Sequence, residues 1–278
     1  MTKFIYERGN PQLTMNDRAM NETISVFDGR VAVVTGAAGN IGLATCRMLC
    51  EAGVKVAATD LDADRLEARI APIREQGLDI RAYEQDVTNR TATEAVFAKI
   101  IDDFGKIDIL VNNAGVWNHR DVRGRQRFEE MDEEEIRRIV EINLFGVMNC
   151  AHAVLPRMVS LGYGRIVNLG SIAGEVGLPG YADYAACKAA VIRFTQTLAM
   201  ENASCGITVN SVSPGMILEK VVPHNGTWVG RTGAPEEVAR AIVFLASDTA
   251  GYLTGVDIPV DGGRILGPHA ASFPGSQA

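Results

Sequence analysis

Residues 31–42 read VAVVTGAAGNIG, and this stretch decides the fold. A short run rich in valine is typical of a buried strand, and the residues that follow, LATCRMLCEAG, have a helical pattern. A turn of small residues between a strand and a helix lets the backbone come close to a pyrophosphate. The free N–H groups and the positive dipole end of the helix then bind that anion. The stretch therefore predicts a dinucleotide site.

The second expected strand, VKVAATD, ends in an acidic residue, Asp60. A carboxylate at this point accepts both ribose hydroxyls of the adenosine half of a dinucleotide, and it repels a 2′-phosphate. Neither Gly39, Asn40 nor Leu61 supplies a compensating base. The sequence therefore predicts NAD rather than NADP as the cofactor.

Short runs rich in Val and Ile alternate with helix-length segments along the rest of the chain. The expected strands are residues 31–36, 54–60, 80–86, 107–115, 164–171, 207–215 and 256–263. This alternation predicts an α/β fold: a single-domain, doubly wound Rossmann fold with a seven-stranded parallel sheet and helices on both faces. The domain is expected over residues 29–263, with an N-terminal extension (1–28) and a C-terminal tail (264–278).

Composition narrows the function class. The chain has 278 residues, of which 47% are hydrophobic and 22% are charged, and its net charge is −7. An acidic chain has no global attraction to nucleic acid or to an anionic membrane, so a small-molecule partner is expected. No stretch approaches the ~20 apolar residues of a membrane span, and the first residues lack the apolar core of a signal peptide. We expect a cytoplasmic protein.

The cysteines do not form a recognisable framework. Their odd number and their spacing match neither a disulfide pattern nor a zinc motif. They are Cys46, Cys50, Cys150, Cys187 and Cys205. We interpret them as reduced packing residues and expect no metal site.

A later segment, YADYAACK (181–188), contains two tyrosines, of which one has a lysine four residues further on. On a helix Tyr184 and Lys188 lie on the same face, whereas Tyr181 has Ala185 at that offset. A nearby ammonium lowers the pKa of a tyrosine from about 10 towards neutrality, so Tyr184 is a candidate acid and base. The alternative is an ordinary exposed pair on an amphipathic helix.

Together these features resemble the classical short-chain dehydrogenase/reductase family. The residues that carry the resemblance, in family order, are Thr35-Gly36 with Gly42, Asp60, Asp86-Val87, Asn112-Asn113-Ala114-Gly115, Asn143, Ser171, Tyr184 with Lys188, and Pro214-Gly215. One departure is Asn40, which stands where the family's turn has its middle glycine. Asparagine tolerates left-handed backbone angles, so we expect the turn to survive.

The resemblance implies a catalytic set of Asn143, Ser171, Tyr184 and Lys188. Tyr184 would exchange a proton with the substrate oxygen while hydride moves to or from the nicotinamide, and Lys188 would hold the nicotinamide ribose and lower the tyrosine pKa. Ser171 would hydrogen-bond the substrate oxygen, and Asn143 would position a water that joins Lys188 to solvent. Taken singly, Ser171 could be a turn cap and Asn143 a buried amide satisfied by the backbone.

The resemblance also implies the contacts to NAD. The expected cofactor-binding residues are Gly36, Asn40, Ile41, Gly42, Asp60, Leu61, Asp86, Val87, Asn113, Ala114, Gly115, Tyr184, Lys188, Pro214, Gly215 and Ile217. Asp86 is expected to bind the adenine amine, and the alternative for it is a cap at the strand end.

We therefore predict an NAD(H)-dependent oxidoreductase that interconverts a secondary alcohol and a ketone. The resemblance implies a homotetramer, built through the helices that bear Asn143 and Tyr184. A catalytically silent NAD-binding sensor or scaffold, and an NADP-dependent ketone reductase, are the alternatives.

The substrate is not readable from the sequence. The segment after the fourth strand crowds basic residues together, namely His119, Arg120, Arg123, Arg125 and Arg127. They could hold an anionic substrate group, or they could neutralise the acidic residues that follow at 129, 130 and 132–135. In the later loop, Glu219 stands where the family often has a threonine that contacts the nicotinamide amide. The same loop offers Val222, His224 and Trp228 as possible pocket walls.

Overall fold

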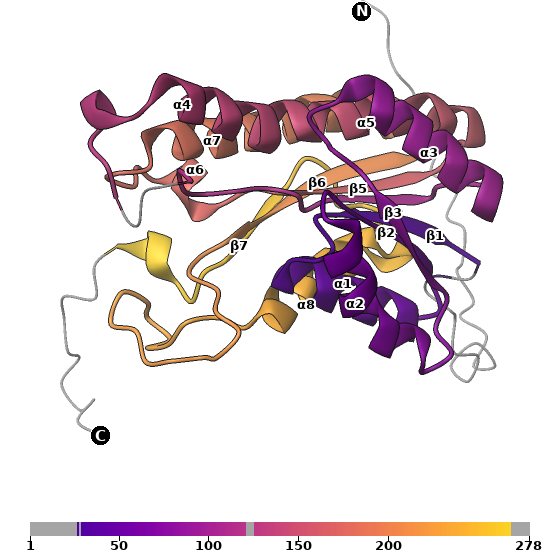
Figure 1. Cartoon of the computed structure of the whole chain (residues 1–278), viewed down its shortest axis with the longest axis horizontal. Helices are drawn as coiled ribbons and strands as arrows, with labels where there is room; N and C mark the ends of the chain where they lie inside the picture. The colour runs from indigo at the N-terminus through magenta and orange to yellow at the C-terminus, as the bar shows by residue number, and fades with distance from the viewer. Residues whose placement is uncertain (1–26, 28, 121–124, 268–278) are drawn as a thin grey trace, which may run out of the picture.

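The computed structural model describes residue 27, residues 29–120 and residues 125–267. Expectations about the N-terminal extension, the tail beyond residue 267 and Arg123 lie outside the described residues. The described chain forms one seven-stranded parallel sheet with the strand order β3-β2-β1-β4-β5-β6-β7. The predicted doubly wound α/β fold is confirmed (Figure 1).

Each strand lies inside a segment that the sequence predicts as a strand. They are β1 (Val31–Thr35), β2 (Lys55–Asp60), β3 (Ile80–Glu84), β4 (Ile109–Asn112), β5 (Gly164–Leu169), β6 (Ile207–Pro214) and β7 (Asp257–Val260). The predicted end of the second strand at Asp60 is confirmed, and the other predictions extend past the carboxyl ends of the strands because they include residues that form the turns. These turns, rather than the strands themselves, build the site.

The helices cover both faces of the sheet (Figure 1). One layer holds α1 (Asn40–Glu51), α2 (Ala63–Arg74) and α8 (Pro235–Ala246). The other holds α3 (Arg90–Phe104), α4 (Glu133–Val140), α5 (Gly146–Leu161) and α7 (Ala182–Asn202), and a π-helical turn, η3 (Glu141–Phe145), joins α4 to α5. The short elements are α6 (Ile172–Glu175) and the 3-10 turns η2 (Phe128–Glu130), η4 (Ala203–Cys205), η5 (Asp248–Ala250) and η6 (Arg264–Leu266).

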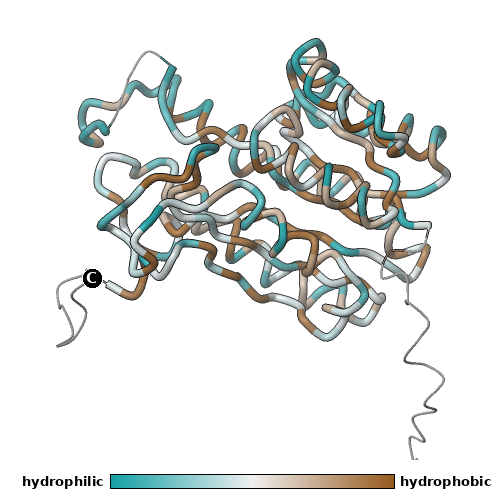
Figure 2. Tube along the Cα trace, turned by 90° about the horizontal axis from the view of Figure 1, so that it is seen from below, coloured by the Kyte–Doolittle hydropathy of each residue, from teal (hydrophilic) through white to brown (hydrophobic). Residues whose placement is uncertain are grey.

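Alternate strand residues separate two hydrophobic cores. In β1, Ala32 and Val34 pack in the core under α1, α2 and α8, whereas Val33 packs in the core under α3, α5 and α7. Leu49 of α1 and Phe97 of α3 are both almost completely buried in these cores. The helices in Figure 2 carry hydrophobic and hydrophilic residues in alternation, as expected when one side of a helix is buried. The sheet is therefore a rigid base for its carboxyl-end turns.

Buried amides fix α7 to the sheet. Asn112 Nδ2 donates to Asn168 Oδ1 at 2.8 Å, which links β4 to β5. Asn168 Nδ2 donates in turn to Thr195 Oγ1 of α7 at 2.9 Å. Because buried polar groups are costly when unpaired, this chain of hydrogen bonds sets where α7 lies over the sheet.

One helical stretch, Glu133–Leu161, is long and apolar enough to cross a membrane, judged by length and composition alone. It consists of α4, η3 and α5, and it packs against α3 and α7 in the outer layer of the fold. A core helix of a soluble protein passes the same test. We therefore interpret this stretch as part of the α/β domain.

Candidate active site

The turn after β1 lies tightly against the turn after β4. Gly36 has φ +63°, and a Cβ there would lie 2.7 Å from Ala114 Cα. A Cβ at Gly42 would lie 2.5 Å from the Gly36 carbonyl oxygen. Asn113 Nδ2 donates to the carbonyl oxygens of Thr35 and Gly36, both at 2.9 Å. Glycine is thus required at both positions by the close approach of backbone to backbone.

The N-terminus of α1 opens onto this turn without a side-chain cap. Among the described residues no side chain accepts from its first N–H groups, and no acidic residue stands in its first turn. Unpaired N–H groups at a positive dipole end form an anion site when glycines let a ligand approach. The backbone around Gly36 and Gly42 therefore fits a pyrophosphate.

Asn40 differs from its expected role. It is the first residue of α1, and among the described residues only glycines have a positive φ. The expectation that Asn40 is tolerated through left-handed angles is wrong, because the turn keeps its shape with Asn40 inside the helix. Arg69 Nη2 donates to Asn40 Oδ1 and Arg69 Nη1 donates to the Ala38 carbonyl oxygen, both at 3.0 Å.

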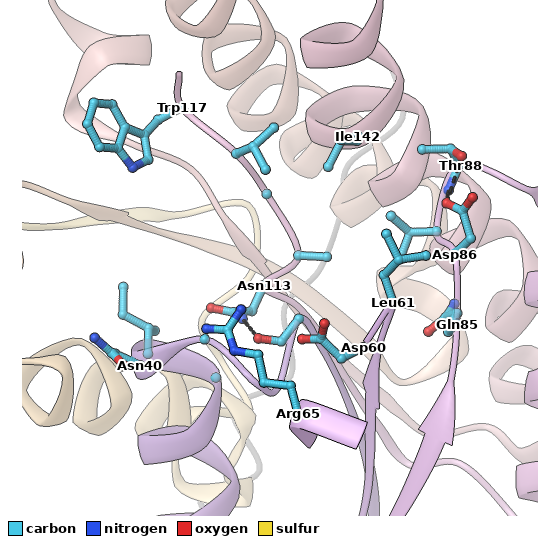
Figure 3. A pocket seen from close by; sticks show the side chains of 18 of the residues that line it. Asn40, Asp60, Leu61, Arg65, Gln85, Asp86, Thr88, Asn113, Trp117 and Ile142 are labelled. Carbon is cyan, nitrogen blue, oxygen red and sulfur yellow. Dashed lines mark hydrogen bonds between the residues drawn. The ribbon is translucent and has the colours of Figure 1, made fainter. Parts of the chain in front are cut away.

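A cleft of about 810 Å³ opens at the carboxyl ends of β1, β2 and β4, where the strand order reverses (Figure 3). Such a reversal is where doubly wound sheets bind ligands. The structure brings together in this cleft the predicted residues Gly36, Asn40, Ile41, Gly42, Asp60, Leu61, Asp86, Val87, Asn113, Ala114, Gly115 and Ile217. Tyr184, Lys188, Pro214 and Gly215 do not line it.

Pro214 and Gly215 lie at the junction between β6 and β7. Pro214 ends β6, and Gly215 N donates to the Val260 carbonyl oxygen at 3.0 Å. A Cβ at Gly215 would lie 2.8 Å from Asp261 Cα. In the structure these two residues lie where the ends of β6 and β7 pack closely together. Their contact with a cofactor stays a prediction.

Asp60 keeps one carboxylate oxygen largely available to a ligand. Its Oδ2 accepts from Ala38 N at 2.9 Å, whereas its Oδ1 accepts only a long bond from Asp62 N at 3.4 Å. Arg65, from the first turn of α2, lines the same cleft, and Figure 3 shows both side chains extending into it. The expectation that no base compensates Asp60 therefore overlooked Arg65, which stands five residues further along the chain.

Asp86 has the expected role of a cap at the strand end, and its contact with the adenine amine stays a prediction. Its Oδ1 caps the turn by accepting from Thr88 N and Thr88 Oγ1, at 2.9 and 2.7 Å. The residue is nevertheless exposed and lines the cleft. The cleft also contains residues that the sequence analysis missed: Arg65, Gln85, Thr88, Val116, Trp117, Arg138, Glu141, Ile142 and Pro235. Only Gln85, Thr88 and Val116 carry a sequence signal, because they adjoin predicted strand-end residues.

Tyr184 and Lys188 lie one turn apart in α7, as predicted, with Lys188 Nζ 5.7 Å from the centre of the tyrosine ring. Burial raises the pKa of Tyr184, and a hydrogen bond with Ser171 opposes part of that rise. Ser171 also caps α6 by accepting from Ala173 N at 3.1 Å, and its hydrogen bond to a substrate oxygen stays a prediction.

The expected lowering of the tyrosine pKa by Lys188 is wrong for the protein chain by itself. Lys188 is 4% exposed, and its Nζ donates to the Leu169 carbonyl oxygen at 2.7 Å. Burial lowers the pKa of Lys188 to about 8, because a dry interior disfavours the ammonium as much as it disfavours a phenolate.

Asn143 is fully buried in η3 and holds the segment after β4. Its Nδ2 donates to the carbonyl oxygens of Val116 and Ile139, at 2.7 and 2.9 Å, and its Oδ1 accepts from Val116 N at 3.3 Å. A Cβ at Gly115 would lie 2.8 Å from Asn143 Oδ1 and 3.6 Å from Lys188 Nζ. Because Gly115 also lines the cleft, the catalytic candidates adjoin the dinucleotide site.

The arginines after β4 pair mainly with the acidic residues that follow them. Arg120 Nε lies 3.8 Å from Glu135 Oε1, and Arg127 Nε donates to Glu129 Oε1 at 2.5 Å. Arg120 also lines the cleft. Arg125 lies over the ring of Tyr181, 6.0 Å from its centre. His119 is buried against Asp183 and is not free to meet an anion.

The loop after β6 folds back on itself. Isolated bridges join Ile217 to Gly233 and Pro223 to Arg231, and Arg231 forms a two-point ion pair with Glu237 of α8. Glu219 is exposed at the beginning of this loop. The proposed wall residues Val222, His224 and Trp228 do not line the cleft.

Comparisons with known proteins agree with this geometry. A family model described as "Enoyl-(Acyl carrier protein) reductase" matches residues 36–264. The chain is 37% identical to the 3-oxoacyl-[acyl-carrier-protein] reductase FabG of Thermotoga maritima over 250 residues, which are 86% of this chain and 99% of the relative. It is 41% identical to the acetoacetyl-CoA reductase of Rhizobium meliloti over 248 residues, which are 84% of this chain and 98% of the relative.

Two solved structures are similar over most of their length. The crystal structure of gox2181 has a TM-score of 0.82 and 33% identity, and the match covers 87% of this chain and 98% of that one. The crystal structure of an NAD+-bound xylitol dehydrogenase has a TM-score of 0.80 and 33% identity, and the match covers 85% and 99% of the two chains.

The buried lysine predicts an unusual pH dependence of stability. The pKa of Lys188 is lowered to about 8 from its ordinary value of 10.5. Between these pH values the unfolded chain binds more protons than the folded chain, so this residue makes stability rise with pH. We expect the free energy of unfolding of the wild type, relative to Lys188→Met, to increase by about 3 kcal/mol as the pH rises across this window.

Urea unfolding followed by circular dichroism, at several pH values, measures this difference. Lys55→Met, at an exposed lysine of β2, is the matched control and should show no such trend. A difference between wild type and Lys188→Met that does not change with pH would contradict the interpretation of Lys188.

Proposed function

The chain belongs to the classical short-chain dehydrogenase/reductase family, and from that premise we propose an NAD(H)-dependent oxidoreductase that interconverts a secondary alcohol and a ketone. Membership makes it an oxidoreductase with a nicotinamide cofactor. The observation that carries the finer proposal is the grouping of Tyr184 with Lys188, whose Nζ lies 5.7 Å from the tyrosine ring centre and close to Gly115 of the cleft. Ser171 opposes part of the rise in the Tyr184 pKa.

The cleft residues fit a dinucleotide in three respects. The glycine turn admits a pyrophosphate to the uncapped N-terminus of α1. Asp60 Oδ1 accepts one long internal bond, at 3.4 Å, and would therefore be able to accept a hydrogen bond from a ribose hydroxyl. Gly115, at the other end of this lining, approaches Lys188 Nζ. When bound there, NAD supplies the carbon that accepts or gives the hydride.

The protein's own side chains carry out the proton transfer. We propose that Tyr184 Oη gives a proton to the carbonyl oxygen during reduction and takes one from the alcohol during oxidation. Ser171 hydrogen-bonds the same substrate oxygen as charge develops on it. Lys188 stays largely protonated at neutral pH with its pKa of about 8, and we propose that its ammonium holds the nicotinamide ribose.

The pKa of Tyr184 bears on the direction of proton transfer. Because burial raises this pKa, the phenol is protonated at neutral pH and is ready to act as an acid in reduction. Oxidation needs the opposite state, and each pKa unit by which the phenol must be lowered corresponds to about 1.4 kcal/mol. We propose that the positive charge of oxidised NAD supplies this free energy.

Asp60 supports NAD as the preferred cofactor, since its carboxylate repels a 2′-phosphate. One specific observation favours the alternative of an NADP-dependent ketone reductase: Arg65 lines the same cleft, and Arg69 lies at the glycine turn. A similar solved structure is described as NAD+-bound, which adds support for NAD.

The preference of the enzyme for NAD or NADP tests whether Asp60 or the nearby arginines dominate cofactor binding. We expect the wild type to use NAD with a kcat/KM about tenfold or more above that for NADP, because one charge-assisted hydrogen bond is replaced by repulsion. Asp60→Ser should raise kcat/KM for NADP, which narrows or reverses that ratio. Adding Arg65→Gln to this variant should lower kcat/KM for NADP again. Asp64→Ser, at an exposed acid in the same first turn of α2, is the matched control.

The assay is absorbance at 340 nm with secondary alcohols, polyols such as xylitol, and 3-oxoacyl thioesters such as acetoacetyl-CoA. The last two classes are included because the relatives' names mention them. A wild type that prefers NADP would overturn the cofactor proposal. Tight NAD binding without turnover of any compound would favour a silent NAD sensor or scaffold.

We further propose a homotetramer in the cytoplasm, packed through the helices that bear Asn143 and Tyr184. Apolar side chains stand exposed on this layer, including Phe145, Val159 and Met200. The five cysteines are free, which fits a reducing compartment. Light scattering after size exclusion that reports only monomer would contradict the assembly.

A further inference from the structure

A buried histidine–aspartate pair lies outside the proposed chemistry. His119, in the segment after β4, and Asp183, in the first turn of α7, meet with Nε2 and Oδ2 2.8 Å apart. Their side chains are 7% and 4% exposed. Burying two such groups is costly unless they satisfy one another, so the pair is a built contact rather than a chance approach of surface groups.

Asp183 connects this pair to the tyrosine that follows it. Its second oxygen, Oδ1, accepts from the backbone N–H of Tyr184 at 2.8 Å. A carboxylate in the first turn of a helix is also favoured by the helix dipole. The Asp183 carboxylate therefore binds His119 with one oxygen and the first turn of α7 with the other.

The other side-chain hydrogen bonds of segment 116–120 lead to η3 and α4 and not to α7. Val116 bonds to Asn143 of η3 in both directions. The Asn118 carbonyl oxygen accepts from Arg138 of α4 at 2.8 Å, and Arg120 N donates to Glu135 of α4. Among these side-chain bonds, the one from His119 is the bond that reaches α7.

This segment also forms a wall of the cleft. Trp117 lines the cleft and is 56% exposed, and its ring centre lies 5.9 Å from that of Tyr181, the residue that precedes α7. A shift of the segment relative to α7 would therefore move Trp117 relative to Tyr184. Catalysis is sensitive to such movements, since a misplacement of about 1 Å can cost on the order of 100-fold in rate.

We propose that His119 is a positioning residue, which acts through Asp183 to fix the Trp117 wall against the beginning of α7 and so to hold Tyr184 in its reactive position. The inference rests on the proposed function for its kinetic readout. It also has a readout that is independent of turnover, because Trp117 is one of only two tryptophans in the chain.

The test compares His119→Leu, which removes the polar partner, with His119→Gln, whose amide can still donate to Asp183. His152→Gln, at an exposed histidine of α5, is the matched control. All are made with Trp228→Phe, so that fluorescence quenching by acrylamide reports Trp117 alone. Kinetics at 340 nm give kcat and KM, and calorimetry gives the Kd for NAD.

We expect His119→Leu to lower kcat by about 10- to 100-fold. The Kd for NAD should change by less than about twofold, because the glycine turn, Asp60 and the other cleft residues outside segment 116–120 stay in place. Trp117 should become more accessible to acrylamide. His119→Gln should recover much of both losses, and His152→Gln should match its parent. If His119 only stabilised the fold, His119→Leu would lower the amount of folded protein. The folded fraction would then keep its kcat, and His119→Gln would have no loss of kcat to recover.

A folded His119→Leu with unchanged kcat and unchanged quenching would overturn the inference. If this variant does not fold, Asp183→Asn is measured instead, since it keeps an acceptor oxygen for Tyr184 N but removes the charge that His119 meets. Unchanged kcat and quenching in Asp183→Asn would likewise overturn the inference. Absence of turnover in the parent protein would count against the proposed function, and quenching would then decide the positioning role alone.

Discussion

The close approach of the turns after β1 and β4 is the constraint on which the rest of the site depends. Gly36 and Ala114 leave no room for a side chain between them, and Asn113 holds the two turns together. This contact fixes the direction of α1, whose uncapped N-terminus faces the cleft. The chain then continues to Gly115, which lies close to both Asn143 Oδ1 and Lys188 Nζ. A cofactor cleft and a proton-handling group are thus joined through a few residues of backbone.

Burial dominates the electrostatics of the catalytic pair. It raises the pKa of Tyr184 and lowers the pKa of Lys188, so that the dry interior opposes the charged form of each. The protein chain offsets this only in part, through the Ser171 hydrogen bond and the bond from Lys188 to Leu169. The same low polarity strengthens any charge that a cofactor brings to the site. Chemistry at Tyr184 is in this account coupled to cofactor binding.

Local pattern was enough to predict the strands and the placement of Tyr184 and Lys188 one turn apart in α7. Valine-rich runs mark buried strands, and a four-residue spacing places Tyr184 and Lys188 on one face. Contacts between distant segments could not be predicted in this way: Arg65 enters the cleft from α2, and His119 finds Asp183, which is 64 residues away. The direction of the Tyr184 pKa was also missed, because a sequence shows charge partners but not burial. Asn40 was misjudged because the first residue of α1 could not be located from the glycine spacing alone.

The most direct measurement of the central claim is NADH formation during one turnover by Tyr184→Phe, compared with Tyr181→Phe and with the wild type. The two tyrosines stand three residues apart, but only Tyr184 has the bond to Ser171 and the neighbouring lysine. The account predicts that Tyr184→Phe binds NAD with wild-type affinity and forms NADH at least about 100-fold more slowly, whereas Tyr181→Phe keeps most of the rate. Wild-type NADH formation by Tyr184→Phe would contradict it.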